Sequence, residues 1–159
     1  MIIGIDPGKS GGVAFLSDEG DWIAGHRMPM KKIGVRDVVD SNELHAMCTT
    51  ALGFTTDAPK LIAIEFVTSF GQGRTSAFNF GRYVGAIEAW SQEWCGDVRF
   101  VTPQVWKKAW GLSRDKRASL QLASVKFPGA PVDWSVLAND GIAEAGLLAL
   151  YMVRKHCIV

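Results

Sequence analysis

Four acidic residues stand beside apolar segments, where an unpaired carboxylate is unfavourable. Asp6 follows the first apolar run of the chain, and Glu65 follows another, so each acid closes a segment typical of a buried strand. Asp140 and Glu144 open a long apolar segment and are four residues apart, a spacing that places both on one face of a helix. Because a buried carboxylate needs a cation, a donor or a metal ion beside it, these residues predict a site where acids and cations meet.

Carboxylate oxygens are the ligands that Mg²⁺ prefers in proteins. Four acids from two strands and one helix can hold two Mg²⁺ ions about 4 Å apart, one activating a water and the other stabilising the leaving 3′ oxygen of a phosphodiester. This chemistry needs no nucleophilic side chain, which suits a sequence with three histidines and no Ser-His-Asp pattern. For Asp140 the alternative is structural, because a negative charge stabilises a helix N-terminus.

The apolar pattern predicts the elements that carry these acids. Runs at residues 2–5, 13–16 and 22–28 are separated by short turns, which predicts three antiparallel strands. Further strands are expected at 61–64 and 98–101, with helices between and after them. The last helix is expected from about residue 136 to 154. Strands followed by alternating elements predict an α/β fold with a mixed sheet.

Composition limits the class of protein. A chain of 159 residues fits one compact domain, and 48% apolar residues with a net charge of +1 exclude global disorder. Any nucleic-acid site must therefore come from local clusters of cations. Three cysteines and three histidines without ligand spacing argue against a zinc site or a disulfide framework. No apolar run is long enough to cross a membrane and no signal peptide is recognised, so we expect a cytoplasmic protein with reduced thiols.

Several motifs resemble those of RuvC-type Holliday-junction resolvases, and they occur in the same order. Ile3–Gly8 resembles the first motif of that family, Ala63–Glu65 the second, and Asp140–Ala145 the C-terminal acidic helix. The stretches Phe70–Gly73 and Phe78–Arg82 resemble bacteriophage members in particular. The resemblance covers most of the chain.

The resemblance implies an RNase H-like fold in a single domain over residues 1–159, with a five-stranded mixed sheet flanked by helices and its first three strands antiparallel. It implies a Mg²⁺-dependent endonuclease, with Mn²⁺ as a substitute, that cuts four-way and other branched DNA in recombination and repair. The products would carry 5′-phosphate and 3′-hydroxyl ends, and the active form would be a homodimer. The residues that the resemblance makes both catalytic and metal-binding are Asp6, Glu65, Asp140 and Glu144. In the bacterial pattern the last two acids are both Asp and three residues apart, whereas here the spacing is four and the second is Glu.

Cations and aromatic residues near these acids are the expected DNA contacts. The resemblance places lysines at Lys107 or Lys108 and at Lys116. The polar run at residues 71–76, which includes Arg74, precedes a helix whose free N–H groups suit a phosphate. Bacterial members carry an aromatic residue after the second acidic motif, where Thr68 aligns here, so Phe70 or Phe66 is the candidate to replace it. We expect the tryptophans to serve core or dimer-interface packing instead; they are Trp22, Trp90, Trp106, Trp110 and Trp134.

Other functions stay open from the sequence alone. One half of an actin-like or sugar-kinase-like ATPase also begins with a strand, an Asp and a glycine turn, but such proteins need two domains and 159 residues are too few. A nuclease of the same fold that acts on RNA is a further alternative, because phosphate and metal contacts do not distinguish the sugar. A non-catalytic protein that binds junction DNA is the third, although all four acids are present.

Overall fold

The computed structural model describes residues 1–53, 58–67, 73–94, 97–113 and 115–156. Its centre is a five-stranded sheet in the order β3-β2-β1-β6-β7. The strands β1 and β2, and β2 and β3, pair antiparallel, whereas β1 and β6, and β6 and β7, pair parallel. This confirms the predicted mixed sheet with three antiparallel strands first. The strands are β1 (Ile2–Asp6), β2 (Gly12–Leu16), β3 (Trp22–Arg27), β6 (Leu61–Glu65) and β7 (Val98–Val101).

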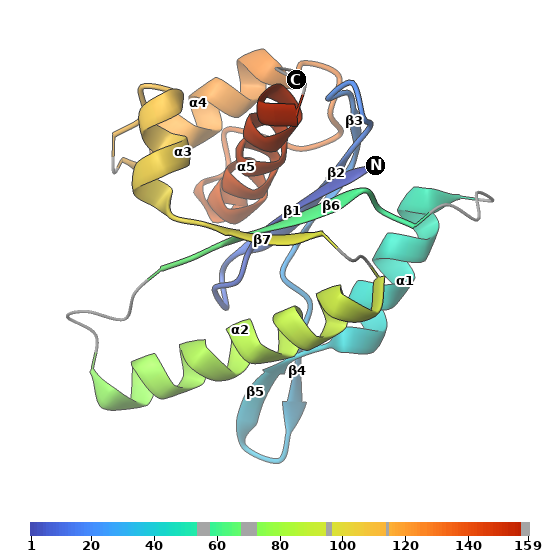
Figure 1. The fold of residues 1–159 in the computed structure, drawn as a ribbon. Helices are drawn as coiled ribbons and strands as arrows, with labels where there is room; N and C mark the ends of the chain where they lie inside the picture. The colour runs from blue at the N-terminus through green and yellow to red at the C-terminus, as the bar shows by residue number, and fades with distance from the viewer. Residues whose placement is uncertain (54–57, 68–72, 95–96, 114, 157–159) are drawn as a thin grey trace.

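Helices cover both faces of the sheet (Figure 1). One face carries α3 (Pro103–Ala109), α4 (Lys116–Lys126) and α5 (Asp140–His156), and the other carries α1 (Ser41–Leu52) and α2 (Arg74–Trp94). A short 3₁₀ turn, Leu137–Asn139, precedes α5. The last helix therefore begins at Asp140 and not near residue 136, so the acid stands at the helix terminus itself.

Strand alternation divides the apolar core into two layers and directs the acids to one of them. On β1, Ile2 packs in the cluster beneath α5, whereas Ile3 packs in the cluster beneath α1 and α2. Since side chains alternate along a strand, Gly4 and Asp6 share the side of Ile2. On β6 the α5 side again takes every second residue, ending in Glu65. Both strand-end carboxylates thus face the helix that carries the other two acids.

The helix α5 lies against the sheet with backbone close to backbone. A Cβ atom on Gly4 would come within 2.0 Å of the Ala145 carbonyl oxygen. In the turn after β1, Gly11 forms an isolated parallel bridge with Gly141, and a Cβ atom on Gly141 would lie 2.4 Å from the Gly11 carbonyl carbon. Glycine permits this approach because it has no side chain. These contacts hold the first turn of α5 beside the end of β1.

The segment between β3 and α1 forms a hairpin that the apolar pattern did not predict. Its strands, β4 (Met30–Ile33) and β5 (Arg36–Val39), pair antiparallel as a separate two-stranded sheet. Charged residues interrupt both strands, so the segment lacks the alternation on which strand prediction depends. It projects from the body on the side of α1 and α2 (Figure 1).

The predicted roles of the tryptophans and of one cysteine are confirmed. Trp90 and Trp106 are buried, and the partly buried Trp22, Trp110 and Trp134 pack against the core beneath α5. Cys48 is a buried free thiol, whereas Cys95 and Cys157 lie outside the described residues. Within the described ranges, no helix has both the length and the apolar character to cross a membrane.

Candidate active site

Asp6 and Glu65 end two neighbouring strands. The register pairs Ile5 with Ile64, so the two acids are the next residues on adjacent parallel strands. Glu65 is buried, with 6% of its surface exposed, and Asp6 is partly buried. Because parallel strands end at the same edge of a sheet, both carboxylates lie at one place beneath α5.

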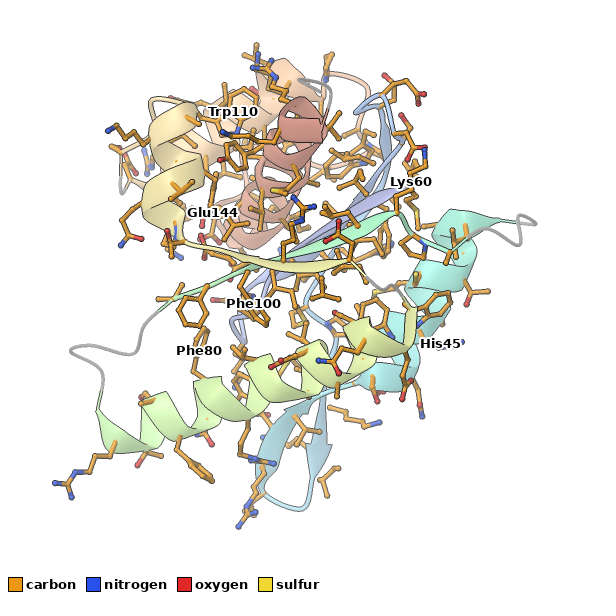
Figure 2. The ribbon with its side chains drawn as sticks, viewed as in Figure 1. His45, Lys60, Phe80, Phe100, Trp110 and Glu144 are labelled. Carbon is orange, nitrogen blue, oxygen red and sulfur yellow. The ribbon has the colours of Figure 1, made fainter. Side chains whose placement is uncertain are left out.

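Asp140 and Glu144, on the first two turns of α5, lie opposite these two strand-end acids. Asp140 is the first residue of α5 and is buried, and Glu144 follows one turn later and is partly buried. Figure 2 shows Glu144 between α5 and α3, beside the sheet edge. All four acids that the sequence singled out thus lie at one corner of the molecule. We call this group, Asp6, Glu65, Asp140 and Glu144, the acid corner.

The carboxylates of this corner act on one another electrostatically. Burial raises the pKa of Asp6 to about 6, and the negative charges of Glu144 and Asp140 add to this effect, while an N–H from Gly8 opposes it. Burial, together with the charges of Asp6 and Glu144, raises the pKa of Glu65 to about 7. Mutual repulsion of this kind is relieved when a cation is shared between the acids.

Two of the predicted lysines face the acids of α5. The Nζ of Lys107 lies 2.6 Å from Oε1 of Glu144, and the Nζ of Lys116 lies 2.5 Å from Oδ2 of Asp140. Lys108 is exposed, and with Lys107 it lines an open pocket of about 600 Å³ between α3 and the segment that follows it. Lys107 and Lys116 therefore lie at the acid corner, and Lys108 lies beside the pocket that Lys107 also lines.

The remaining predicted DNA contacts have mixed outcomes. Arg74 is exposed at the first turn of α2, whereas Phe70 and Thr68 lie outside the described residues. Phe66 directly follows Glu65, is 43% exposed, and meets the ring of Phe100 edge-on at 5.9 Å between centroids. Figure 2 shows Phe100 on the α2 side of β7, so this aromatic pair lies on the opposite side of the sheet from the acids.

Sequence reasoning missed two residues that hold the acids in place. The indole Nε1–H of Trp106 donates a hydrogen bond to Oε1 of Glu65 at 3.0 Å, and the hydroxyl of buried Ser119 donates to Oε1 of Glu144 at 3.0 Å. Trp106 is fully buried, so it has the predicted packing role and a polar role as well. Its position beside Lys107 in the sequence was the one available signal.

The donors at this corner suit a hard divalent cation, although they are not preassembled as its site. In the described part of the chain, no three Asp, Glu, His or Cys side chains are grouped so that they can hold a metal ion. Glu144 and Asp140 instead point to Lys107 and Lys116. The chemistry nevertheless fits Mg²⁺, because the four side chains that converge there, Asp6, Glu65, Asp140 and Glu144, are all carboxylates.

The raised pKa values predict an unusual pH dependence of stability in metal-free buffer. In the folded state the pKa of Asp6 rises from 3.8 to about 6, and the pKa of Glu65 rises from 4.5 to about 7. The folded state therefore binds these protons more tightly than the unfolded state. Stability then falls as the pH rises through this range, and we expect the free energy of unfolding to be roughly 2–4 kcal/mol lower at pH 8 than at pH 5. Carboxylates with lowered pKa values, such as Asp18, are ionised throughout this window and do not contribute.

Urea unfolding at pH 5 and pH 8, in EDTA, measures this difference. The double variant Asp6→Asn, Glu65→Gln should lose most of it, since neither amide titrates. Equal stability of the wild type at both pH values would show that the two acids are not buried as described.

Comparison with known proteins supports the fold. No protein-family model and no curated protein sequence matches the chain. Two solved structures of RuvC from Thermus thermophilus are similar at 19% identity, each covering 98% of this chain and 95% of that one. The TM-score is 0.63 for the structure in complex with a Holliday junction substrate and 0.57 for the other. Over nearly its whole length, the chain has the RNase H-like fold of RuvC.

Proposed function

We propose that this chain is a Mg²⁺-dependent endonuclease that cuts Holliday junctions and other branched DNA, as a single nuclease domain over residues 1–159. The observation that carries the proposal is the convergence of Asp6, Glu65, Asp140 and Glu144 at one corner beneath α5. The fold adds support, because the similar RuvC structure holds a Holliday junction substrate. Homodimerisation belongs to the same proposal, since two symmetric cuts need two sites, as does action on DNA in a bacterial cytoplasm.

In this proposal the four acids hold Mg²⁺, with Mn²⁺ as a substitute. Bound metal would supply an activated water and would stabilise charge on the leaving 3′ oxygen, which would give 5′-phosphate and 3′-hydroxyl ends. The chain itself positions the ligands: two acids lie on strands of the central sheet, and two lie one helical turn apart on α5. Trp106 donates a hydrogen bond to one oxygen of Glu65, which fixes the orientation of that carboxylate.

The cations around the corner would bind the DNA backbone. Lys107 and Lys116 form ion pairs with Glu144 and Asp140, so both would be within reach of a phosphate held there. Lys108 and Arg74 are exposed and would contact phosphates further along the DNA. Phosphate contacts give affinity that falls with salt. Phe70 completes the proposed set of DNA contacts.

The decisive experiment is a cleavage assay on four-way, three-way, flap and linear duplex DNA, in Mg²⁺ and in EDTA. The proposal expects branched DNA to be cut in Mg²⁺ only, with linear duplex left intact. A parallel RNA–DNA hybrid tests the alternative of an RNA-directed nuclease of the same fold. Tight junction binding without any cutting, in Mg²⁺ or Mn²⁺, would favour the non-catalytic alternative.

A Trp106→Phe variant tests how Glu65 is oriented. Phenylalanine keeps an aromatic ring but removes the Nε1–H that Glu65 accepts at 3.0 Å. We expect the cleavage rate at saturating junction to fall about tenfold, because a hydrogen bond to a charged group contributes about 1.5–3 kcal/mol. The Mg²⁺ concentration for half-maximal rate should rise, while junction affinity stays the same.

Trp110→Phe is the matched control. Its Nε1–H donates at 3.1 Å to the Leu147 carbonyl oxygen, so Trp110→Phe also loses an indole hydrogen bond and ring volume, but the acceptor is a backbone carbonyl and not one of the four acids. Equal effects of the two substitutions on the Mg²⁺ dependence would show that Trp106 acts only through packing.

A further inference from the structure

The β4–β5 hairpin has an anchored base and a free tip. Its base is held by Val39, which is buried, and by Met30, which packs against the core beneath α1 and α2. Pairing of Ile33 with Arg36 leaves a two-residue turn. The first turn residue, Gly34, has a φ of 60°, which two-residue hairpin turns require of their first central position. The hairpin is thus a defined element and not a loose connection.

The tip of the hairpin is apolar and exposed. Val35, the second turn residue, is 93% exposed, and Ile33 beside it is 63% exposed. Such turn positions favour Gly, Asn, Asp or Ser, which stabilise the turn itself. A valine there stabilises neither the turn nor the core. Single exposed apolar residues are common, but two at the tip of a projecting element form a surface that fits a partner.

The chemistry around the tip selects a polyanion as that partner. The hairpin carries three cations, Lys31, Lys32 and Arg36, against one acid, Asp37, in a chain whose net charge is only +1. Lys32 pairs with Asp37 at 3.0 Å and Lys31 with Asp40 at 2.8 Å, which leaves an excess of positive charge at the exposed Arg36. Cations beside an apolar tip match a nucleic acid, which offers phosphates beside the faces of its bases.

The hairpin is tied to the same edge of the sheet as the acid corner. Lys9, in the turn that follows Asp6, forms an ion pair with Asp37 of β5 at 2.6 Å. The backbone of that turn also holds the catalytic candidate, because the Gly8 N–H donates to Oδ1 of Asp6 at 3.2 Å. Figure 1 shows the hairpin projecting beyond α2, on the side of the sheet away from α5. The acid corner and the hairpin lie on opposite sides of the sheet but share this turn, so DNA bound to both would pass around the end of β1.

We propose that the β4–β5 hairpin is a DNA-binding arm that recognises the branch point. Ile33 and Val35 pack against base surfaces that are exposed where stacking is interrupted, and Lys32 and Arg36 contact the phosphates of the adjoining arm. Apolar side chains act on DNA in this way when they enter between base steps. A continuous duplex offers no such surface without the cost of unstacking, so the tip favours branched over linear DNA. This inference rests on the proposed junction-cutting function.

The test uses the Asp6→Asn protein, which keeps DNA intact, and compares it with the same protein carrying Ile33→Ser and Val35→Ser. Fluorescence anisotropy measures affinity for a four-way junction and for a linear duplex of equal length. We expect the two serines to weaken junction binding at least tenfold and duplex binding less than twofold. The control is Val125→Ser on α4, which is 71% exposed and lies on the other side of the sheet; it should change neither affinity.

An Arg36→Ala variant separates the cation from the apolar tip. It should weaken binding to both DNAs and lower the slope of log affinity against log salt by about one, whereas the serine variant should leave that slope unchanged. A 2-aminopurine base at the branch point should brighten on binding Asp6→Asn, and lose this signal with the serine variant.

Three outcomes would overturn the inference, and they are distinguishable. If Asp6→Asn shows no preference for the junction, the proposed function fails and the inference fails with it. If the preference is present and the serine variant retains it in full, only the hairpin inference fails. If light scattering shows that the serine variant converts a dimer to a monomer, the tip is a contact between copies of the chain and not a DNA contact.

Discussion

The Glu65→Gln variant should bind four-way junctions like the wild type and cut them at least about a thousandfold more slowly. An amide keeps the size of the carboxylate and can still accept the Trp106 hydrogen bond, but it has no negative charge for Mg²⁺. Asp6→Asn should behave in the same way, since the two acids are neighbours on adjacent strands. Cleavage under single-turnover conditions and anisotropy in Ca²⁺ measure the two quantities separately.

Folding must be excluded as the cause of any loss. Because burial and like charge raise the pKa of both acids, each amide variant should be at least as stable as the wild type at pH 8 in EDTA. Glu43→Gln, the same change at an exposed acid of α1, is the control and should cut normally. Full activity in either Glu65→Gln or Asp6→Asn would refute the nuclease proposal.

The second large effect, a loss of stability, is expected when Gly4 is replaced. Gly4 carries no functional group and acts only by allowing α5 to pack closely against β1. Its side of β1 faces α5, and an added Cβ would stand 2.0 Å from the Ala145 carbonyl oxygen and 2.9 Å from the Ala149 nitrogen. Both neighbours are backbone atoms of a helix, so they cannot move aside by changing a rotamer. Gly4→Ala should therefore destabilise the protein by about 3 kcal/mol or more, as measured by urea unfolding.

The control is Gly85→Ala in α2, where an added Cβ meets nothing within 4 Å. Alanine is the better helix former, so this change should raise stability by up to about 1 kcal/mol. A Gly4→Ala protein within 1 kcal/mol of the wild type would mean that α5 does not lie as close to β1 as described.

The sheet and the acid corner were largely predictable because their signals are local. Each acid followed or opened an apolar run, and those runs form the strands and the helix that carry the acids. The four-residue spacing of Asp140 and Glu144 placed both on one face of α5. The side of the sheet that Asp6 and Glu65 face was not predictable in this way, because β1 and β6 are buried on both sides.

The parts that escaped prediction depend on contacts between distant residues or on segments without periodicity. Trp106 and Glu65 are 41 residues apart in the sequence, and Ser119 and Glu144 are 25 apart, so no local sequence pattern contains either pair. The β4–β5 hairpin was missed because its stability comes from Val39 and Met30 on the core, not from an alternating pattern. The apolar residues at its tip also hide the turn, because turns are usually recognised by Gly, Asn, Asp, Ser or Pro.

Close backbone contacts at glycines join the start of α5 to the turn after β1 and the first residue of β2. They fix the distance between Asp6 and Asp140 even when side chains elsewhere in the core change size. A Cβ on Gly12 would lie 2.7 Å from the Gly141 carbonyl carbon, and one on Gly141 would lie 2.4 Å from that of Gly11, so main chain meets main chain there with no side chain between. A mutant library that varies the size of core residues would leave the separation of Asp6 and Asp140 almost unchanged. A library that varies these glycines would contain a smaller fraction of active clones than the core library, even though the glycines act only by positioning the acids.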